Sequence, residues 1–179
     1  MTAALIVPDA ARAIEIYARA LGAEQLVLNV EPDGKTVTHA EIGIGDSRIF
    51  LGDEAGAMGA KSPKTLGGTT ASIHLYFEDA DALYDRAVSA GAKGVMPPMD
   101  MFWGDRYARV VDPYGHEWGI ATHIADPTPE QMEKDRRAFF ERMTQRPPGA
   151  RSPEGGAYAH AESGAGQAVA DGGRTIPLM

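Results

Sequence analysis

The sequence predicts an α+β domain built from two tandem βαβββ units, and three observations support this prediction. An amphipathic stretch opened by Asp9 and closed by Gly22 recurs as a stretch opened by Asp79 and closed by Gly91, at offsets of 70 (79 − 9) and 69 (91 − 22) residues. Residues 45–49 align with the segment 69 residues further on. A duplicated unit of this size forms a pseudo-twofold domain, and we expect its ligand site where the halves face each other.

The first unit is predicted to contain a strand, a helix and three more strands. Residues 3–7 form a short apolar run typical of a strand. Asp9 is a suitable helix N-cap because its carboxylate accepts from the free amides of the first turn. Apolar residues then recur at helical spacing up to Leu21, and Gly22 suits the left-handed position after a helix. Strands follow at 26–30, 36–44 and 47–51, separated by turns at Pro32-Asp33-Gly34 and Gly45-Asp46.

The second unit repeats this order after a linker. Residues 52–70 are rich in Gly, Ala, Ser and Pro, which indicates a flexible connection. A strand at 71–77 precedes a helix that Asp79 caps and Gly91 ends. The remaining strands are expected at 94–96, 106–111 and 116–121, with Asp112-Pro113-Tyr114-Gly115 as the last hairpin turn. The units thus cover about residues 1–53 and 71–124, within one domain of residues 1–124.

The C-terminal part differs in composition from the two units. A helix is predicted within residues 125–144, and because most of its residues are charged we expect it on the surface or at a subunit contact. Residues 145–179 are dominated by Gly, Ala, Pro and Ser without periodicity, so we expect a disordered tail. The alternative is a short terminal anchor at residues 176–179.

Composition limits the classes of function. The chain has 179 residues, of which 44% are apolar, as is ordinary for a globular core. It has no cysteine, so neither disulfides nor thiolate metal sites can form. A net charge of −8 argues against nucleic-acid binding. The start lacks the features of a signal peptide and no apolar run approaches the ~18–20 residues of a membrane span, so we expect a cytoplasmic protein with no membrane partner.

Two motifs carry a family resemblance. The run Met101-Phe102-Trp103-Gly104-Asp105-Arg106-Tyr107, followed by Asp112-Pro113-Tyr114-Gly115-His116-Glu117-Trp118, resembles the PhnB-like subgroup of the vicinal oxygen chelate superfamily. This superfamily includes glyoxalase I, fosfomycin and bleomycin resistance proteins, and extradiol dioxygenases. The resemblance covers about residues 3–124. It implies a glyoxalase-like, curved mixed sheet cup that holds a small molecule, and a homodimer, because relatives commonly form cups across two chains.

The resemblance also locates where a metal would be held. Metal-dependent relatives place their ligands on four strands, and these positions correspond to Thr2, Phe50, Ser72 and Gly119. None is a histidine or a carboxylate, whereas a divalent ion needs two to four such ligands. We therefore expect no cofactor and no metal at the usual place. A displaced divalent-metal site that joins His74 and Glu117 with His39 or Glu41 stays open as the disfavoured alternative.

Strand alternation selects further residues for the cup. If Ser72 points inward, so do His74 and Tyr76, and if Gly119 points inward, so does Glu117. His74 and Glu117 are therefore candidate catalytic residues, as a general acid/base pair. The alternative is a polar pair that braces the two halves.

Aromatic and basic residues complete the candidate site. Trp103 follows the loop-like segment 97–101 at the mouth of the cup, where it either lines the pocket or packs under the loop. Trp118 alternates with Glu117 and is expected on the helix-covered face. Arg106 can meet an anionic ligand group, unless it forms a surface ion pair. The candidate ligand-binding residues are Phe50, Ser72, Tyr76, Trp103 and Arg106.

These features lead to three hypotheses about function. The first is a protein of the bleomycin-resistance type that binds a small organic molecule without the usual metal. The second is a superfamily enzyme (a lyase, isomerase or dioxygenase) that uses His74 and Glu117 or a non-standard metal site. The third is a partner-binding module that uses the charged C-terminal helix.

Overall fold

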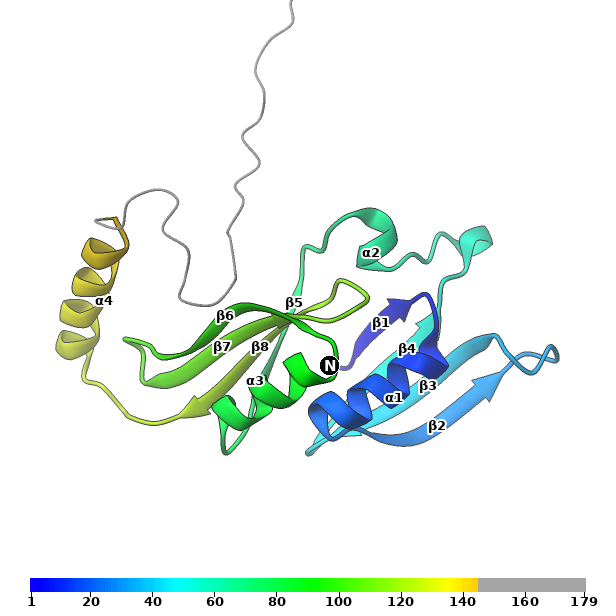
Figure 1. The fold of residues 1–179 in the computed structure, drawn as a ribbon, viewed down its shortest axis with the longest axis horizontal. Coiled ribbons are helices and arrows are strands. Elements are labelled where there is room, and N and C mark those ends of the chain that lie inside the picture. Colours follow the sequence, from blue (N-terminus) through cyan, green and yellow to red (C-terminus); the bar gives the residue numbers. More distant parts are fainter. Residues whose placement is uncertain (145–179) are drawn as a thin grey trace, which may run out of the picture.

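The computed structural model describes residues 1–144 and confirms the α+β class. The first unit contains β1 (Ala3–Val7), α1 (Ala10–Leu21), β2 (Glu24–Val30), β3 (Val37–Ile44) and β4 (Ser47–Asp53). The second contains β5 (Ser72–Tyr76), α3 (Ala80–Ser89), β6 (Lys93–Asp100), β7 (Asp105–Val111) and β8 (Glu117–His123). The chain continues into α4 (Pro129–Thr144). Figure 1 shows the two units side by side, with α4 at the end of the molecule beyond β6 and β7.

Each unit folds into its own four-stranded mixed sheet. The strand order is β1-β4-β3-β2 in sheet one and β5-β8-β7-β6 in sheet two. In each sheet the first strand of the unit pairs in parallel with the last, and the other neighbours are antiparallel. The predicted duplication is therefore present in the topology as well as in the sequence.

The helix ends lie where local sequence signals predicted them. The Asp9 carboxylate accepts from the backbone N of Arg12 at 2.8 Å, and the Asp79 carboxylate accepts from the backbone N of Ala82 at 2.9 Å. Gly22 ends α1 with φ at 70°, in the left-handed region where a side chain is disfavoured. These signals act over one helical turn, so they can be recognised without knowledge of the tertiary structure.

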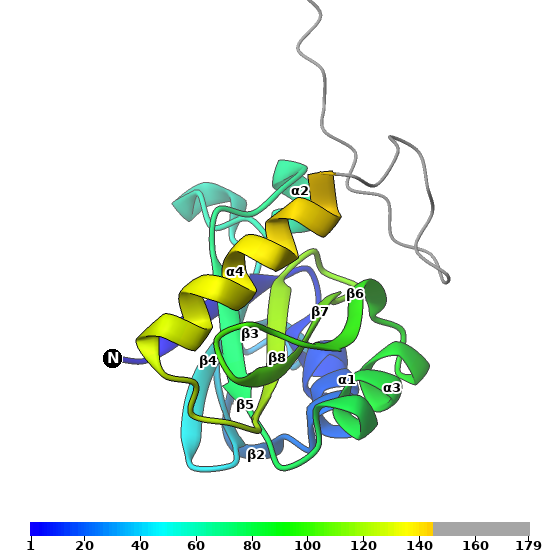
Figure 2. The same cartoon turned by 90° about the vertical axis from the view of Figure 1, so that its left-hand side faces the viewer.

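The core lies between the helices and one face of each sheet. Figure 2 shows α1 and α3 side by side, and both pack against the sheets. Trp118 is buried on this face, as alternation predicted, and its ring contacts that of Tyr17. The hydroxyl of Tyr17 and the indole Nε1 of Trp118 donate to the same Asp112 oxygen, at 2.7 and 3.0 Å. Because Tyr17 and Trp118 belong to different units, this carboxylate ties the units together.

Two segments are more regular than the sequence indicated. β6 runs through Pro97 and Pro98, which the loop-like composition had placed outside any strand. The prolines are tolerated because β6 is an edge strand and its register shifts between Met96 and Met99. Within residues 52–70, a 3₁₀ helix (Gly56–Met58) and α2 (Pro63–Leu66) form, and the Ser62 side chain caps α2.

The ends of the chain add little to the core. α4 is present as predicted and has no buried residue. The predicted disorder of residues 145–179, and the alternative anchor at 176–179, lie outside the described residues. Within residues 1–144, no helix has the length and apolar character needed to cross a bilayer.

Candidate ligand-binding site

The face of sheet two that points away from α3, here called the open face, carries most of the predicted site residues. Pairing of β5 with β8 places Ser72 opposite Glu117, His74 opposite Gly119 and Tyr76 opposite Ala121. Ser72, His74 and Tyr76 are exposed, whereas the alternating Leu75 is buried. The strand thus turns its apolar side to the core and its polar and aromatic side outward.

Two rings lie flat against each other on the open face. The His74 ring stacks on Tyr107 of β7, with centroids 5.3 Å apart and an interplanar angle of 13°. Gly119 of β8 makes this possible: an added Cβ would lie 2.8 Å from the Tyr107 hydroxyl and 3.1 Å from His74 Nδ1. Gly119 occupies a position that carries a metal ligand in metal-dependent relatives. Here it has no side chain and leaves space for the two rings.

The candidate pair His74 and Glu117 lies on one face but has separate partners. Glu117 forms an ion pair with Arg109 of β7, and both side chains are about one-third exposed or less. His74 is one register step away, opposite Gly119, and stacks on Tyr107. An acid/base role for the two residues stays a prediction, since the Glu117 carboxylate is already bound by a guanidinium.

Asp105, at the start of β7, connects several side chains at one end of the open face. It is 4% exposed. Its Oδ2 accepts from the Tyr76 hydroxyl at 3.0 Å and from Trp103 Nε1 at 2.9 Å, and its Oδ1 lies 3.1 Å from His123 Nδ1. Burial raises the pKa of Asp105, but the three hydrogen bonds outweigh burial and leave that pKa below its ordinary value. The carboxylate is thus held in its charged form.

The same hydrogen bonds affect the partners of Asp105. Hydrogen bonding to Asp105 raises the pKa of the Tyr76 hydroxyl, so Tyr76 keeps its proton. Hydrogen bonds to Asp105 and then to Asp126 raise the pKa of His123. His123 therefore carries its positive charge to higher pH than a free imidazole does.

Aromatic side chains extend the open face toward α4. Trp103 lies 5.8 Å from Tyr107 between ring centroids, and Phe102 lies 4.9 Å from Trp103. Phe102 in turn contacts Phe139 and Phe140 of α4, at 5.8 and 6.3 Å. We call the line from His74 through Tyr107 and Trp103 to Phe102 the aromatic row.

A groove borders the open face where the two units meet. Its volume is about 1210 Å³, and it runs between the β3–β4 hairpin of unit one and β5, α3 and the end of β8 of unit two. The polar side chains along it include Asp46, Ser47, His74, Tyr76, Arg86 and His123. A ligand on the aromatic row can therefore extend into space that lies between the two repeats.

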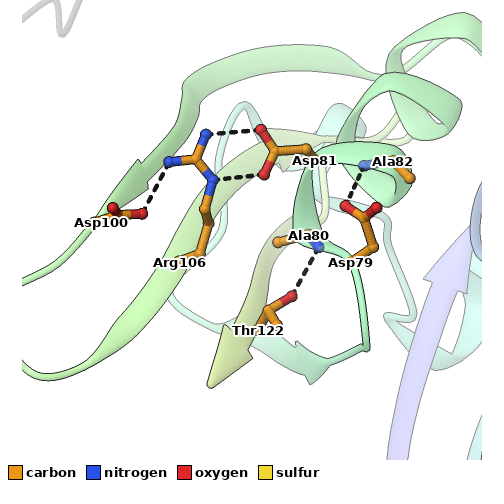
Figure 3. A network of polar contacts seen from close by, with 7 residues as sticks. All are labelled: Asp79, Ala80, Asp81, Ala82, Asp100, Arg106 and Thr122. Atoms are coloured by element: carbon orange, nitrogen blue, oxygen red, sulfur yellow. Dashed lines mark hydrogen bonds and ion pairs between the residues drawn. The ribbon is translucent and has the colours of Figure 1, made fainter. Parts of the chain in front are cut away.

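Arg106 lies on the opposite side of sheet two. Figure 3 shows its guanidinium between Asp81 of α3 and Asp100 of β6. Nε and Nη2 donate to the two Asp81 oxygens at 2.5 and 2.7 Å, and Nη1 donates to Asp100 at 2.9 Å. The hydrogen bond to Arg106 lowers the pKa of Asp81. Arg106 thus connects α3 to β7, on the face of sheet two opposite the aromatic row.

Phe50 lies on the corresponding face of sheet one. Its ring contacts His39 edge to face at 4.9 Å, and Glu41 lies between His39 Nε2 (3.2 Å) and Arg48 Nη1 (2.6 Å). The Glu41–Arg48 pair corresponds in sheet register to the Arg109–Glu117 pair: Arg48 pairs with the residue two after Glu41, and Glu117 pairs with the residue two after Arg109. The two faces therefore carry equivalent ion pairs with reversed polarity.

The family's metal positions do not fit a metal ion. Thr2, Phe50, Ser72 and Gly119 offer two hydroxyls, one ring and a residue without a side chain. Within residues 1–144, no group of three or more His, Cys, Asp or Glu side chains is placed to hold an ion. A divalent cation prefers several imidazole or carboxylate ligands, so this donor set is unsuitable.

Three residues of this site were not selected from the sequence: Asp105, Tyr107 and His123. Asp105 and Tyr107 belong to the motif that carried the resemblance, and alternation places Tyr107 on the same face as Arg109. His123 follows Glu117 at an even spacing along β8, which also predicts the same face. The sequence does not show that His123 contacts Asp105, because this contact forms only in the folded sheet.

Known proteins share this fold and part of the sequence. A family model described as the Glyoxalase/Bleomycin resistance protein/Dioxygenase superfamily matches residues 2–120. An uncharacterized Mycobacterium tuberculosis protein, Rv0887c, is 40% identical over 132 residues, which cover 72% of this chain and 77% of the relative.

Two solved structures illustrate the likeness in three dimensions. TioX from Micromonospora sp. ML1 superposes with a TM-score of 0.54 at 25% identity, covering 69% of this chain and 98% of TioX. The PhnB protein from Bacillus cereus superposes with a TM-score of 0.52 at 16% identity, covering 68% of this chain and 98% of that protein. At this identity the PhnB likeness concerns the fold alone.

Proposed function

The chain belongs to the Glyoxalase/Bleomycin resistance protein/Dioxygenase superfamily, and on this premise we propose that it binds a small, flat organic molecule on the open face of sheet two. The observation that carries the proposal is the aromatic row beside the groove. His74 and Tyr107 present a stacked pair of rings, and Trp103 adds a third ring 5.8 Å from Tyr107. Aromatic faces at this spacing favour stacking with a planar ligand.

We propose that binding proceeds without the divalent metal found in many superfamily members. The support is the donor set at Thr2, Phe50, Ser72 and Gly119, where relatives that use a metal hold it. These side chains cannot replace the water shell of a divalent ion. The ligand is instead held by ring stacking and by polar groups on the groove, such as Asp46 and His123.

The alternative is an enzyme of the superfamily that uses His74 and Glu117 or a displaced metal site. Calorimetric titration of the purified protein with Zn²⁺, Ni²⁺, Mn²⁺ and Fe²⁺ separates the two functions. We expect no stoichiometric, tight uptake of any of these ions. Tight uptake that the His74→Ala substitution abolishes would favour the enzyme and overturn metal-free binding.

Ligand binding is tested with Nile red, a neutral planar dye whose emission changes when it leaves water. We expect saturable binding of one dye per chain. His74→Ala and Trp103→Ala each remove one stacking surface, worth roughly 0.5–1.5 kcal/mol, so each should weaken binding about two- to twelvefold. Val88→Ala is the matched control, because Val88 is an exposed apolar residue on α3, on the face of sheet two opposite the aromatic row.

Two results would contradict the proposed site. One is dye binding that Val88→Ala weakens as much as His74→Ala does, which would indicate adsorption to exposed apolar surface. The other is a dye that does not bind to the folded protein at all.

We also propose that the protein is a homodimer. Support comes from exposed apolar side chains on β2, namely Leu26, Leu28 and Val30. The reversed ion pairs add to it, because sheet one of one chain and sheet two of a second chain would bring opposite charges together. In such a dimer the Glu41–Arg48 face would complete a cup over the aromatic row.

A further inference from the structure

We propose that Asp105 is the positioning residue of the ligand-binding face, and that it orients Tyr76 and Trp103 without touching the ligand. This inference rests on the proposed function of the aromatic row. Asp105 is 4% exposed, so its carboxylate is out of reach of a ligand. The residues that it contacts, by contrast, come from β5, from the connection before β7 and from β8.

The hydrogen bonds to Asp105 define where two rings point. Tyr76 is 63% exposed, so packing alone does not fix its ring. Its hydroxyl and the indole N–H of Trp103 donate to the same oxygen, Oδ2, at 3.0 and 2.9 Å. Each ring has one polar hydrogen, and a charged acceptor binds it about twice as strongly as a neutral one. Loss of the charge therefore weakens the hold on both rings at once.

The backbone around Asp105 is held by other contacts. Gly104 has φ at 97°, and an added Cβ would lie 2.0 Å from the Ala125 carbonyl oxygen. The Gly104 carbonyl accepts from the backbone N of Ile124 and Ala125, at 2.9 and 3.0 Å, and the Met101 N donates to the Asp105 carbonyl at 2.8 Å. Substitution of the Asp105 side chain therefore leaves these backbone contacts in place.

Asparagine cannot make all the contacts of Asp105. Its side chain has one acceptor oxygen, whereas the structure uses both carboxylate oxygens. If the amide nitrogen takes the Oδ2 position, it faces the Trp103 N–H, donor against donor. If it takes the Oδ1 position, the interaction with charged His123 is lost. Asp105→Asn therefore removes at least one bond in either orientation.

The test compares Asp105→Asn with Asp126→Asn as a matched control. Asp126 contacts His123 at Nε2, as Asp105 does at Nδ1, but it contacts neither ring. The sequence has two tryptophans, so the ¹H–¹⁵N spectrum has two indole signals, which Trp103→Phe assigns. We expect Asp105→Asn to move the Trp103 signal upfield, leave the Trp118 signal in place and weaken Nile red binding about tenfold. Asp126→Asn should change neither.

A second variant keeps the inference testable if Asp105→Asn does not fold. Tyr76→Phe retains the ring at an exposed position and removes only the hydroxyl that donates to Asp105. We expect it to weaken Nile red binding roughly two- to fivefold, because the ring loses its anchor. Unchanged affinity in this variant would overturn the inference.

The outcomes distinguish this inference from the proposed function. A Trp103 signal that does not move in Asp105→Asn, or one that moves while dye affinity stays constant, would overturn the positioning role. A wild-type protein that binds no dye would instead refute the proposed binding face, while the Trp103 signal would still report whether Asp105 orients that ring.

Discussion

At the scale of single residues, Gly119 is required for the arrangement of the open face. Gly119→Ala would place a Cβ 2.8 Å from the Tyr107 hydroxyl, closer than real Cβ atoms come to a neighbour, and 3.1 Å from His74 Nδ1, which is tighter than most Cβ contacts. The two rings must then move apart. We expect Nile red affinity to fall about tenfold, with a melting temperature lowered by several degrees, as for overpacking of about 1 kcal/mol or more.

The control for Gly119 is Gly68→Ala. An added Cβ at Gly68 meets no atom within 4 Å, and its backbone is not left-handed. This variant should retain wild-type affinity and melting temperature in the same assays. Equal behaviour of the two variants would show that the His74–Tyr107 stack does not depend on the missing Cβ.

The contacts of His123 predict a pH dependence of stability. Hydrogen bonds to Asp105 and Asp126 raise its folded-state pKa above 6.5. Protonated His123 therefore contributes to the free energy of unfolding. This contribution is complete below the unfolded-state pKa and is lost as pH rises through the folded-state pKa. Asp105 has a lowered pKa despite its burial, so its contribution is present above 3.8 and is lost as pH falls through its folded-state value.

The measurement is the melting temperature of wild type and His123→Gln across pH. Both charges are present between the two ordinary pKa values, so the difference between the proteins should be largest near about pH 5 and shrink above neutrality. A difference in melting temperature that grows with rising pH would contradict the stabilisation of protonated His123 by Asp105 and Asp126.

At the scale of elements, the Arg106–Asp81 contact fastens α3 to β7. The pair is bidentate, but the side chains are 34% and 50% exposed, so solvent reduces its value. A double-mutant cycle with Arg106→Ala and Asp81→Ala should give a coupling energy of about 0.5–1 kcal/mol that decreases with added salt. The cycle is measured by urea unfolding, and a coupling near zero would assign the α3–β7 attachment to apolar packing alone.

Some helices and strands could be predicted from the sequence, and others could not. The Asp9 and Asp79 caps were predictable because capping depends on residues within one turn. The strand through Pro97 and Pro98 was not, because tolerance of proline depends on β6 being an edge strand, and that follows from sheet order. The short helices within residues 52–70 were missed for a similar reason: α2 is held by a hydrogen bond from the backbone N of Lys64 to the carbonyl of Tyr114 in the second unit.

The site could be predicted in part by the same logic. Alternation along β5 and β8 placed His74, Tyr76 and Glu117 on one face, because a period of two needs no tertiary information. Strand alternation could not identify the partners of Arg106, because its two carboxylate partners come from α3 and β6. The aromatic row and Asp105 depend on contacts between β5, β7 and β8, which only the folded sheet defines.

At the scale of the whole molecule, the proposed homodimer predicts a mass of 38 kDa, twice the 19.0 kDa of one chain. Light scattering after size exclusion measures this mass directly. If complementary charges on the two faces contribute, Arg48→Glu should shift the equilibrium toward the monomer, because it removes one of the reversed ion pairs. Arg12→Glu on the exposed side of α1 is the control and should leave the dimer intact. A monomer at all concentrations would contradict the two-chain cup.

We propose that this molecule uses the family's cup for metal-free binding of a flat ligand on the aromatic row. A crystal structure of the protein with Nile red, with anomalous data collected for transition metals, tests it most directly. We expect dye density stacked on His74 and Tyr107 and no anomalous peak near Thr2, Phe50, Ser72 or Gly119. A coordinated cation at those positions, or dye bound only elsewhere, would contradict it.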